Sequence, residues 1–470
     1  MTDVVVIGAG VGGLAVAIRL AVAGRRVVVL ERHGSVGGKL AVHERDGFRF
    51  DAGPSLVTLP AVFDELFRVA GTSLRDEVDL VRLDPQFQYS WRDGRRLIVT
   101  DAGCDAPGYR RFVEHGRTVW AVSERTFFAG PMSGPLSLAR RLEQVRDLTD
   151  IDPFRTLQRS ATRYFDDPHM VQWAGRYATY SGSDPSLAPA TLGCIAAVEH
   201  DFGCWYPMGG LGAVRDALVS VAERVGVEIR CRAEVTAVRT DGAAVAGVEL
   251  AAGEVITAEA IVANADATHL YRDLLPDRRA LRRVRRAEPS SSGFVVMAGV
   301  AGLTEGISHH NVWFSDDSQA EFAQIRAAGM PTDPTIYACV SSVTDPSQAP
   351  AGHENWFLLV NAPAGVTVNA AGYQRVVLEQ LASHGIELRS RLLFADTITP
   401  ADFEKRFTST GGAIYGTSSN GRRAAFARPA NRGARRGLYL VGGSSHPGGG
   451  LPLVVMSAKI VADMIAHDFR

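Results

Sequence analysis

A run of glycines near the start of the chain has the spacing of a phosphate-binding turn. It reads Gly8-Ala9-Gly10-Val11-Gly12-Gly13 and fits the pattern G-x-G-x-x-G. Glycine lets the backbone turn tightly, approach a pyrophosphate and pack closely against a strand. A helix that starts after such a turn offers free N–H groups and the positive end of its dipole to the phosphates. These residues therefore favour dinucleotide binding.

An acidic residue follows at the distance that dinucleotide binding requires. Glu31 lies about twenty residues beyond the glycine turn, where a carboxylate accepts hydrogen bonds from ribose hydroxyls. A carboxylate disfavours a 2′-phosphate, so the nucleotide is expected to be FAD or NAD before NADP. The glycine pair of Gly37-Gly38-Lys39 lets the backbone approach the ligand a second time, and Lys39 places a cation near it.

The elements around these residues form a complete βαβ unit. The apolar run 3–7 is typical of a buried parallel strand, residues 14–24 keep helical spacing, and 26–30 form a second strand that ends at Glu31. Two later stretches also combine apolar strands with helices. One holds a helix over 214–225 and a strand over 260–263, and the other is a strand, a glycine-rich loop and a helix over 453–465. The nucleotide-binding domain is therefore expected to be discontinuous.

The remaining segments differ in character. Residues 86–100 alternate as a hairpin does, and 108–175 indicate helices rich in arginine and aromatic residues. Three apolar runs, 294–300, 336–340 and 356–360, are bounded by turn residues. Such runs are apolar on both faces, so they either floor an apolar cavity or belong to a plain buried core.

Composition limits the class of protein. The chain has 470 residues, 46% of them hydrophobic and 21% charged, and a net charge of −1. It is long enough for two or three domains, and its charge gives no field that attracts nucleic acid. The five cysteines form no C-x-x-C, which argues against a disulfide framework or a metal site and favours buried thiols in a reducing compartment. No signal peptide or membrane-spanning run is visible, so a cytoplasmic protein is expected.

The sequence resembles the FAD-dependent carotenoid desaturases of the bacterial phytoene-desaturase type, from end to end. The motifs that carry the resemblance are the N-terminal unit with Glu31, Gly37-Gly38-Lys39, Asp51-Ala52-Gly53-Pro54-Ser55, the block Arg176 to Ser183, Gly203-Cys204-Trp205-Tyr206-Pro207, Val262-Ala263-Asn264-Ala265-Asp266 and His446-Pro447-Gly448-Gly449-Gly450-Leu451-Pro452. Within the family, the Arg176 block and the last loop look most like enzymes that act at C-3,4 of hydroxylated or methoxylated carotenoids.

The resemblance implies an α/β fold of the flavin amine-oxidase-like superfamily. A discontinuous Rossmann-like FAD-binding domain would comprise residues 1–85, 206–288 and 401–470. A mixed α+β substrate domain would comprise the helix-rich, membrane-facing part 86–205 and the sheet 289–400. The FAD contacts it implies are Gly8, Ala9, Gly10, Gly12, Gly13, Glu31, Arg32, Gly38, Lys39, Pro54, Ser55, Val235, Gly443, Ser444 and Leu453.

The implied chemistry is removal of two hydrogens from a C–C bond of a polyene, one as hydride to the flavin and one as a proton, with FAD carrying the hard step. The bond expected is C-3,4 of a 1-hydroxylated carotenoid. Alternatives are a phytoene desaturase or carotenoid isomerase, an amine or protoporphyrinogen oxidase, and an escort protein without redox turnover. Gly442-Gly443-Ser444-Ser445 weakens the amine-oxidase alternative, because those relatives carry an acidic residue there. The electron acceptor would be oxygen or a quinone.

Few side chains stand out as catalytic. His446 is a weak acid or base candidate, and packing against the glycine loop is the competing interpretation. Glu199, His200 and Asp201 are expected to be solvated or locally bonded. Tyr180, Trp205 and Tyr206 are candidate substrate contacts, against simple core packing for the last two.

A water-insoluble substrate would reach the enzyme from a bilayer. The arginine-rich segment 278–286 is suited to anionic lipid, although an ordinary solvated helix is the competing interpretation. The expected location is therefore the inner face of the cell membrane, as a peripheral protein. The sequence does not indicate an oligomeric state.

Overall fold

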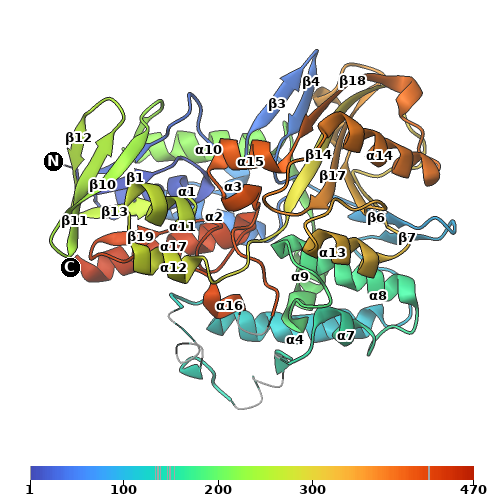
Figure 1. Cartoon of the computed structure of the whole chain (residues 1–470), viewed down its shortest axis with the longest axis horizontal. Helices are drawn as coiled ribbons and strands as arrows, with labels where there is room; N and C mark the ends of the chain where they lie inside the picture. The colour runs from blue at the N-terminus through green and yellow to red at the C-terminus, as the bar shows by residue number, and fades with distance from the viewer. Residues whose placement is uncertain are drawn as a thin grey trace.

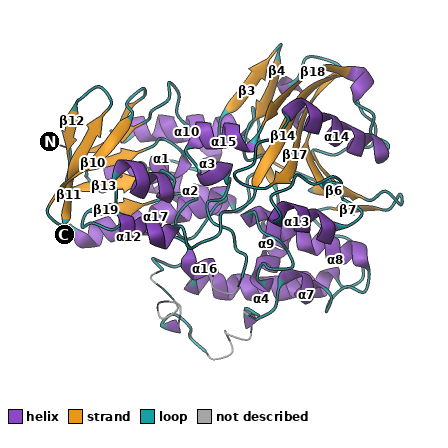
Figure 2. Cartoon of the chain, in the orientation of Figure 1, coloured by secondary structure: helices purple, strands orange, loops and turns teal. Residues whose placement is uncertain are grey.

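The chain folds into two lobes that lie side by side, with a group of helices below one of them (Figure 1). The computed structural model describes residues 2–132, 134, 137, 139–144, 147, 150–152, 154–421 and 424–469. One lobe contains a parallel sheet and both chain ends, and the other contains a larger sheet, as the colouring by secondary structure shows (Figure 2). Some positions of the predicted helix-rich segment 86–205 lie outside the described residues.

The first lobe is built on a five-stranded parallel sheet. Its order is β19-β13-β1-β2-β9, with β19 Leu438–Leu440, β13 Ala260–Ala263, β1 Val4–Ile7, β2 Val27–Leu30 and β9 Glu228–Arg230. Val4 is in register with Val27 on one side and with Ala260 on the other. Three separate stretches of chain therefore form one sheet, and the predicted βαβ unit and the α/β fold class are confirmed.

Layers cover both faces of this sheet, which explains why its strands are apolar throughout. Val4 and Val6 point into a core with helices α1 Val11–Val22, α2 Pro60–Val69, α10 Leu211–Arg224 and α17 Leu451–Asp468. Val5 and Ile7 point the other way, into a core with an antiparallel sheet of β10 Val235–Asp241, β11 Ala244–Leu250 and β12 Val255–Thr257. Alternate residues of one strand thus serve two cores.

The second lobe is built on a seven-stranded sheet of order β18-β14-β17-β16-β15-β6-β7. Its strands are β18 Leu392–Ile398, β14 Ser292–Ala301, β17 His353–Ala362, β16 Ile336–Cys339, β15 His310–Trp313, β6 Phe87–Ser90 and β7 Arg96–Val99. The predicted hairpin β6–β7 joins this sheet because β6 pairs in parallel with β15. Two small sheets pair β3 Val42–Arg45 with β4 Phe48–Asp51, and β5 Leu80–Arg82 with β8 Trp205–Pro207.

Both interpretations of the three apolar runs hold, one for each face of the sheet. Val296 and Leu358 pack in a core with helix α14 Ala370–Ser383. Val295, Phe357 and Leu359 line a large cavity on the opposite face. One surface of these strands therefore supports the fold, and the other borders the space between the lobes.

Helices complete the molecule. Below the large sheet lie α4 Tyr109–Thr126, α7 Leu157–Ala161, α8 Pro168–Gly175, η1 Arg176–Ser181, η2 Ala190–Gly193 and α9 Cys194–Phe202, with an aromatic core that includes Phe112 and Trp173 (Figure 1). The other helices are α3 Leu74–Glu77, α11 Ala267–His269, η3 Leu270–Leu274, α12 Arg278–Val284, α13 Ser318–Arg326, η4 Ser341–Val343, η5 Pro346–Gln348, η6 Arg389–Arg391, α15 Pro400–Phe407, η7 Thr410–Gly412 and α16 Ala424–Ala427. Among the described residues, no helix is long and apolar enough to cross a membrane.

The cysteines follow the expectation only in part. All five have free thiols, and Cys194, Cys204 and Cys339 are buried. Cys104 is half-buried and Cys231 is exposed, so the prediction of buried thiols is wrong for Cys231.

Candidate functional site

A cavity of about 1250 Å³ lies between the two lobes. Its walls come from the glycine turn before α1, the loop after β19, the inner face of the large sheet and helices α8, η1, α13 and α15. Small-molecule pockets typically enclose about 300–1,000 Å³. This cavity therefore has room for an extended nucleotide and part of a second ligand.

The glycine turn has the shape that a pyrophosphate needs. A Cβ atom added to Gly13 would lie 2.1 Å from the carbonyl oxygen of Gly8, so only glycine permits this packing. Gly10 is the N-cap of α1, and neither a side-chain cap nor an acidic residue occupies the first turn. The N–H groups at this helix end are thus available to an anion, as phosphate binding requires.

Glu31 stands at the carboxyl end of β2 and faces the cavity. Its side chain is buried, and its two oxygens accept hydrogen bonds from the N–H of Ala9 at 2.9 Å and the N–H of His33 at 2.9 Å. These bonds fix the carboxylate beside the glycine turn. Each carboxylate oxygen has further acceptor capacity, so ribose hydroxyls can bind here.

The loop after β19 packs directly against the opening turn. A Cβ on Gly12 would lie 3.1 Å from the Cα of Gly442, and Asn264 donates from its side-chain amide to the carbonyl oxygen of Gly8 at 3.2 Å. Ser444 donates to Asp266 at 3.2 Å. The two ends of the chain therefore form one wall of the cavity.

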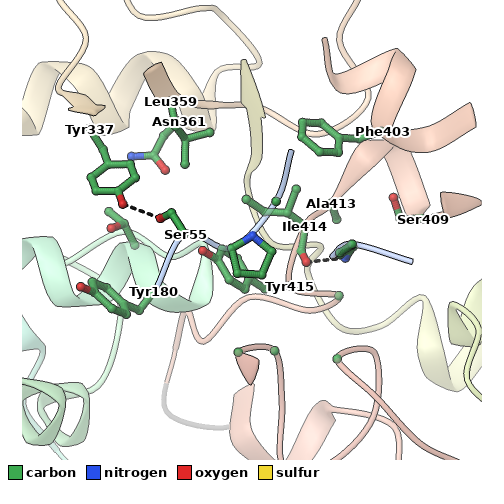
Figure 3. Close-up of a pocket in the computed structure, with 18 of the residues that line it drawn as sticks. Ser55, Tyr180, Tyr337, Leu359, Asn361, Phe403, Ser409, Ala413, Ile414 and Tyr415 are labelled. Atoms are coloured by element: carbon green, nitrogen blue, oxygen red, sulfur yellow. Dashed lines mark hydrogen bonds between the residues drawn. The ribbon is translucent and has the colours of Figure 1, made fainter. Parts of the chain in front are cut away.

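Lys39 extends along the cavity toward the segment that follows α15. Its Nζ donates to the carbonyl oxygen of Ile414 at 2.5 Å, and Ile414 is labelled in Figure 3. Burial lowers the pKa of Lys39 to about 8, and the carboxylate of Asp266 opposes this shift. Lys39 is the cation that the sequence placed near the ligand.

The far part of the cavity is aromatic and aliphatic. Val295, Phe357 and Leu359 come from the large sheet, and Phe403 and Phe407 come from α15. Tyr180, Tyr337, Tyr415 and Ser55 border the same space, and a hydrogen bond of 2.5 Å joins the Ser55 and Tyr337 hydroxyls (Figure 3). A ligand in this part would be shielded from water and contacted mainly by carbon atoms.

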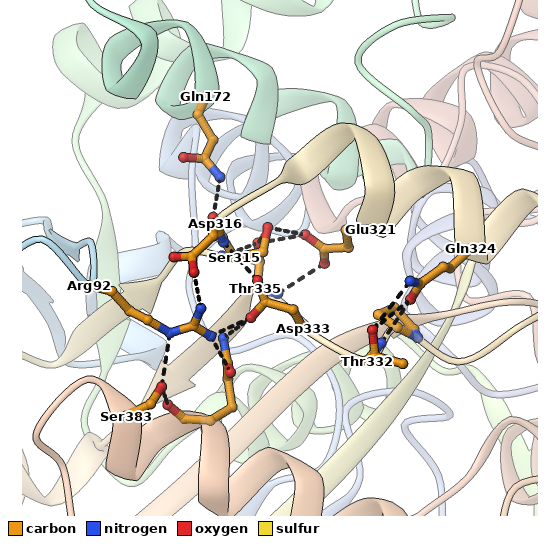
Figure 4. Close-up of polar contacts among 12 residues, drawn as sticks. Arg92, Gln172, Ser315, Asp316, Glu321, Gln324, Thr332, Asp333, Thr335 and Ser383 are labelled. Carbon is orange, nitrogen blue, oxygen red and sulfur yellow. Dashed lines mark hydrogen bonds and ion pairs between the residues drawn. The ribbon is translucent and has the colours of Figure 1, made fainter.

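A buried acid closes another part of the cavity wall. Glu321, on α13, accepts hydrogen bonds from the hydroxyls of Ser315 and Thr335 at 2.9 and 2.7 Å and from the Thr335 N–H at 3.0 Å (Figure 4). Beside it, Arg92 pairs with Asp316 and Asp333. These bonds hold α13 against the ends of β15 and β16.

Most of the predicted contacts meet in this cavity. Its lining includes Gly8, Gly10, Gly12, Glu31, Arg32, Gly38, Lys39, Pro54, Ser55, Val235, Gly443, Ser444 and Tyr180. Ala9, Gly13 and Leu453 lie outside the described lining, and the first two act through the shape of the turn. Trp205 and Tyr206 also lie outside it: Trp205 bonds to the carbonyl oxygen of Phe202, and Tyr206 is fully buried against His309.

His446 is buried rather than exposed to the cavity. Its ring packs edge-on against Phe127 with 4.7 Å between centroids, and burial lowers its pKa to about 4. Neither ring nitrogen has a hydrogen-bond partner among the described residues. This position supports the packing interpretation over acid–base catalysis.

The run at the end of α9 differs from the expectation at Glu199 and agrees with it at Asp201. Glu199 is buried rather than solvated and accepts hydrogen bonds from the hydroxyls of Tyr177, at 3.0 Å, and Tyr180. Burial raises the pKa of Glu199, and the charge of Arg176 opposes this shift. Asp201 is exposed and pairs with Arg117 at 2.7 Å, as a local surface bond.

Sequence reasoning missed several cavity residues. Arg176, Tyr337, Tyr415 and Phe403 were not identified as site residues, because they come from separate elements that only the tertiary fold brings together. Arg176 and Tyr180 belong to the same sequence block, so that block carried part of the signal.

The chain matches one protein family over most of its length and is similar to two full-length relatives. Residues 11–466 match the family described as flavin containing amine oxidoreductase. The chain is 33% identical to the 4,4'-diapolycopene oxygenase of Methylomonas sp, covering 99% of this chain and 98% of that protein. It is 31% identical to the 4,4'-diaponeurosporene oxygenase of Staphylococcus aureus (strain USA300), covering 98% and 97%.

Solved structures share the fold at lower identity. An oxidoreductase from Methanosarcina mazei aligns with a TM-score of 0.66 at 18% identity, covering 98% of this chain and 100% of that one. Putrescine oxidase bound to putrescine aligns with a TM-score of 0.67 at 16% identity, covering 99% of each chain. A fatty acid isomerase from P. acnes aligns with a TM-score of 0.65 at 13% identity, covering 100% and 99%.

Proposed function

The chain belongs to the flavin containing amine oxidoreductase family and is an FAD-dependent oxidoreductase of the bacterial carotenoid-desaturase type, and from this premise we propose that it oxidises a long linear carotenoid near one end. The observation that carries the proposal is the continuity of the cavity. It runs from the glycine turn and Glu31 to a wall of Val295, Phe357 and Leu359 on the large sheet.

 

The nucleotide end of the cavity supports FAD as the cofactor. The N-terminus of α1 and the glycine turn would hold the pyrophosphate, Glu31 the ribose, and the loop with Gly443 and Ser444 the far part of the molecule. Bound FAD supplies the two-electron acceptor that carbon oxidation needs and that side chains lack. The surrounding residues bind, orient and exclude water.

The apolar end of the cavity supports a polyene as the substrate. A linear carotenoid is long, rigid and almost free of polar atoms, so its affinity must come from burial of apolar surface. The aromatic and aliphatic side chains of the large sheet and of α15 offer such a surface beside the nucleotide end. His446 is not needed in this arrangement.

Two reactions at the end of such a polyene are consistent with this site. The first candidate is oxygenation, here proposed at a terminal carbon, and the names of the two full-length relatives support oxygenation as the reaction type. The second is desaturation at C-3,4 of a 1-hydroxylated carotenoid, which is supported by the block that begins at Arg176 and by the last glycine loop. Molecular oxygen would be required for the first reaction, whereas a quinone could accept the electrons of the second.

Product analysis separates the two reactions. The purified holoenzyme is incubated with linear carotenoids that end in a methyl group or a tertiary hydroxyl, under isotopically labelled O₂, and the products are examined by chromatography and mass spectrometry. Oxygenation incorporates the label into an aldehyde or acid, whereas desaturation removes two hydrogens and incorporates none. Failure to convert any linear carotenoid, together with turnover of an amine, would contradict the proposal.

A further inference from the structure

Arg176 places a positive charge in the wall of an otherwise apolar part of the cavity. Its guanidinium carbon lies 4.6 Å from the ring centroid of Phe87, 5.1 Å from that of Tyr180, 5.5 Å from that of Tyr89 and 5.9 Å from that of Tyr337. Four aromatic rings from three elements therefore surround one cation. Such stacking holds the flat faces of a guanidinium and leaves its N–H edge free to donate.

The hydrogen bonds of Arg176 use only part of that edge. Nη1 donates to the hydroxyl of Tyr180 at 3.2 Å and to that of Tyr89 at 3.4 Å. Nε and Nη2 have no acceptor among the described residues. Neither of these atoms is fully buried. Because Arg176 lines the cavity, these N–H groups are open to it.

The nearest buried carboxylate does not use these groups. Both oxygens of Glu199 accept hydrogen bonds from tyrosines, Tyr177 and Tyr180, and no carboxylate of the described residues forms an ion pair with Arg176. Arg176 is half-buried, and its remaining N–H groups face the cavity without an acceptor among the described residues. An apolar ligand that displaces water from this part of the cavity must supply an oxygen atom or leave the cation unpaired.

We propose that the free edge of Arg176 is a recognition site for an oxygen atom, a hydroxyl, aldehyde or carboxylate oxygen, at the end of a linear polyene. The inference rests on the proposed function and, of its two candidate reactions, favours the one whose substrate already carries oxygen at one end. A hydrocarbon of the same length would fill the same apolar wall but leave the guanidinium edge unpaired. Discrimination against it follows, because a site built to bond an oxygen loses that bond with the hydrocarbon.

Binding to the holoenzyme with its flavin kept reduced under anaerobic conditions tests the proposal, because neither an oxidised flavin nor oxygen is then present for turnover. The probes are an acyclic polyene aldehyde and the hydrocarbon of equal conjugated length. Wild-type protein is expected to bind the aldehyde about ten- to a hundredfold more tightly. The absorption band of the aldehyde should also shift to longer wavelength, because a cation at the carbonyl stabilises the excited polyene.

The variant Arg176→Met should bring the affinity ratio of the two probes to about one and abolish the band shift. Arg176→Lys keeps the charge and should retain part of both effects, and Arg239→Met, at an exposed arginine on β10, is the matched control that should change neither. If Arg176→Met does not fold, the band shift of the wild-type protein and the ratio in Arg176→Lys still test the site.

Two results would overturn the inference. One is a wild-type protein that binds both probes equally and shifts neither band. The other is an Arg176→Met variant with an unchanged affinity ratio. If flavin affinity and flavin absorption change in that variant while the ratio does not, the edge is assigned to a carbonyl oxygen of the flavin. Failure of the wild-type protein to bind either polyene would instead contradict the proposed function.

Discussion

At the scale of single residues, the site depends on three side-chain properties: the absence of a Cβ at Gly13, the fixed position of the Glu31 carboxylate and the burial of Glu321. Gly13 supports the phosphate turn through the space that it leaves empty, since a Cβ there would collide with backbone rather than with a flexible side chain. Glu31 acts through position, because two backbone N–H groups hold its carboxylate at the cavity edge. Glu321 acts through burial, which sets its protonation state.

The variant Gly13→Ala should lose FAD and stability together. Its Cβ would lie 2.1 Å from the Gly8 carbonyl oxygen, so the turn must distort, at an expected cost of about 3 kcal/mol in the free energy of unfolding. Bound flavin per protein and urea denaturation measure the two effects. Gly329→Ala is the matched control, because its Cβ meets nothing nearer than 3.5 Å. Normal flavin content in Gly13→Ala would contradict the assignment of the turn.

Glu321 should make stability depend on pH. Burial raises its pKa from 4.5 to about 7, with hydrogen bonds from Thr335 and Ser315 in opposition. Between these values the folded chain holds a proton that the unfolded chain has lost. The resulting stabilisation is complete below pH 4.5 and disappears as the pH rises through 7, with a total change of about 3 kcal/mol.

The variant Glu321→Gln tests this linkage, because glutamine cannot titrate and can still accept from the Thr335 N–H. Urea denaturation from pH 4.5 to 8 should show a stability that falls less with pH than that of the wild-type protein. Glu379→Gln, at an exposed position on α14, is the control and should keep the wild-type slope. Equal slopes for Glu321→Gln and wild type would show that Glu321 is ionised throughout.

At the scale of elements, α12 is the clearest candidate for contact with a membrane. Ala280, Leu281 and Val284 pack against the core, while the arginines face solvent and none of them forms an ion pair among the described residues; they are Arg278, Arg279, Arg282, Arg283, Arg285 and Arg286. Exposed arginines without ion pairs favour anionic lipid headgroups. We therefore predict that α12 binds anionic lipid surfaces.

Liposome co-sedimentation tests this role of α12. Binding should require anionic lipid and decline with salt, because each arginine near the surface contributes about 1 kcal/mol. The double variant Arg279→Glu/Arg283→Glu should weaken binding more than tenfold. The control is Arg239→Glu/Arg375→Glu, which changes the net charge by the same amount and should bind the liposomes more tightly than the α12 variant does. Absence of binding at low salt, or equal loss in both variants, would contradict a role for α12.

The sequence predicts correctly those elements whose pattern lies within one continuous stretch of residues. The glycine turn, the strand 260–263 and the last loop were placed correctly, because glycine spacing and apolar runs report on local backbone geometry. Arg176 and Tyr337 were missed because their environment is formed by strands far apart in the chain. Trp205 and Tyr206 have the residue types of a substrate wall, yet neither lines the cavity, because Trp205 bonds to the carbonyl oxygen of Phe202 and Tyr206 is buried against His309.

At the scale of the whole molecule, the site joins the two ends of the chain. The opening turn and the loop after β19 pack against each other, and Arg25 near the start donates to the carbonyl oxygen of Phe469 near the end at 2.6 Å. A ligand that spans this junction binds only the folded chain. Its binding free energy therefore adds to the stability of both ends.

Adding FAD to the apoprotein should raise the melting temperature and slow amide hydrogen exchange in two separate segments, residues 8–13 and 443–452. At a free FAD concentration one hundred times the Kd, the stabilisation should be about 2.7 kcal/mol. Exchange measured by mass spectrometry locates the protection. Protection confined to the first segment would show that the terminal loop is not part of the cofactor site, and strand β7 should change little in either case.

The order of the strands in the parallel sheet has a consequence for synthesis. β1 leaves the ribosome first, but its neighbour β13 follows only after residue 260, and β19, which completes the sheet, is made near the end. At about 5–20 residues per second, the apolar edge of β1 waits for tens of seconds without its partner. During that interval the nascent chain needs protection from aggregation, and the parallel sheet is complete only once β19 has been made.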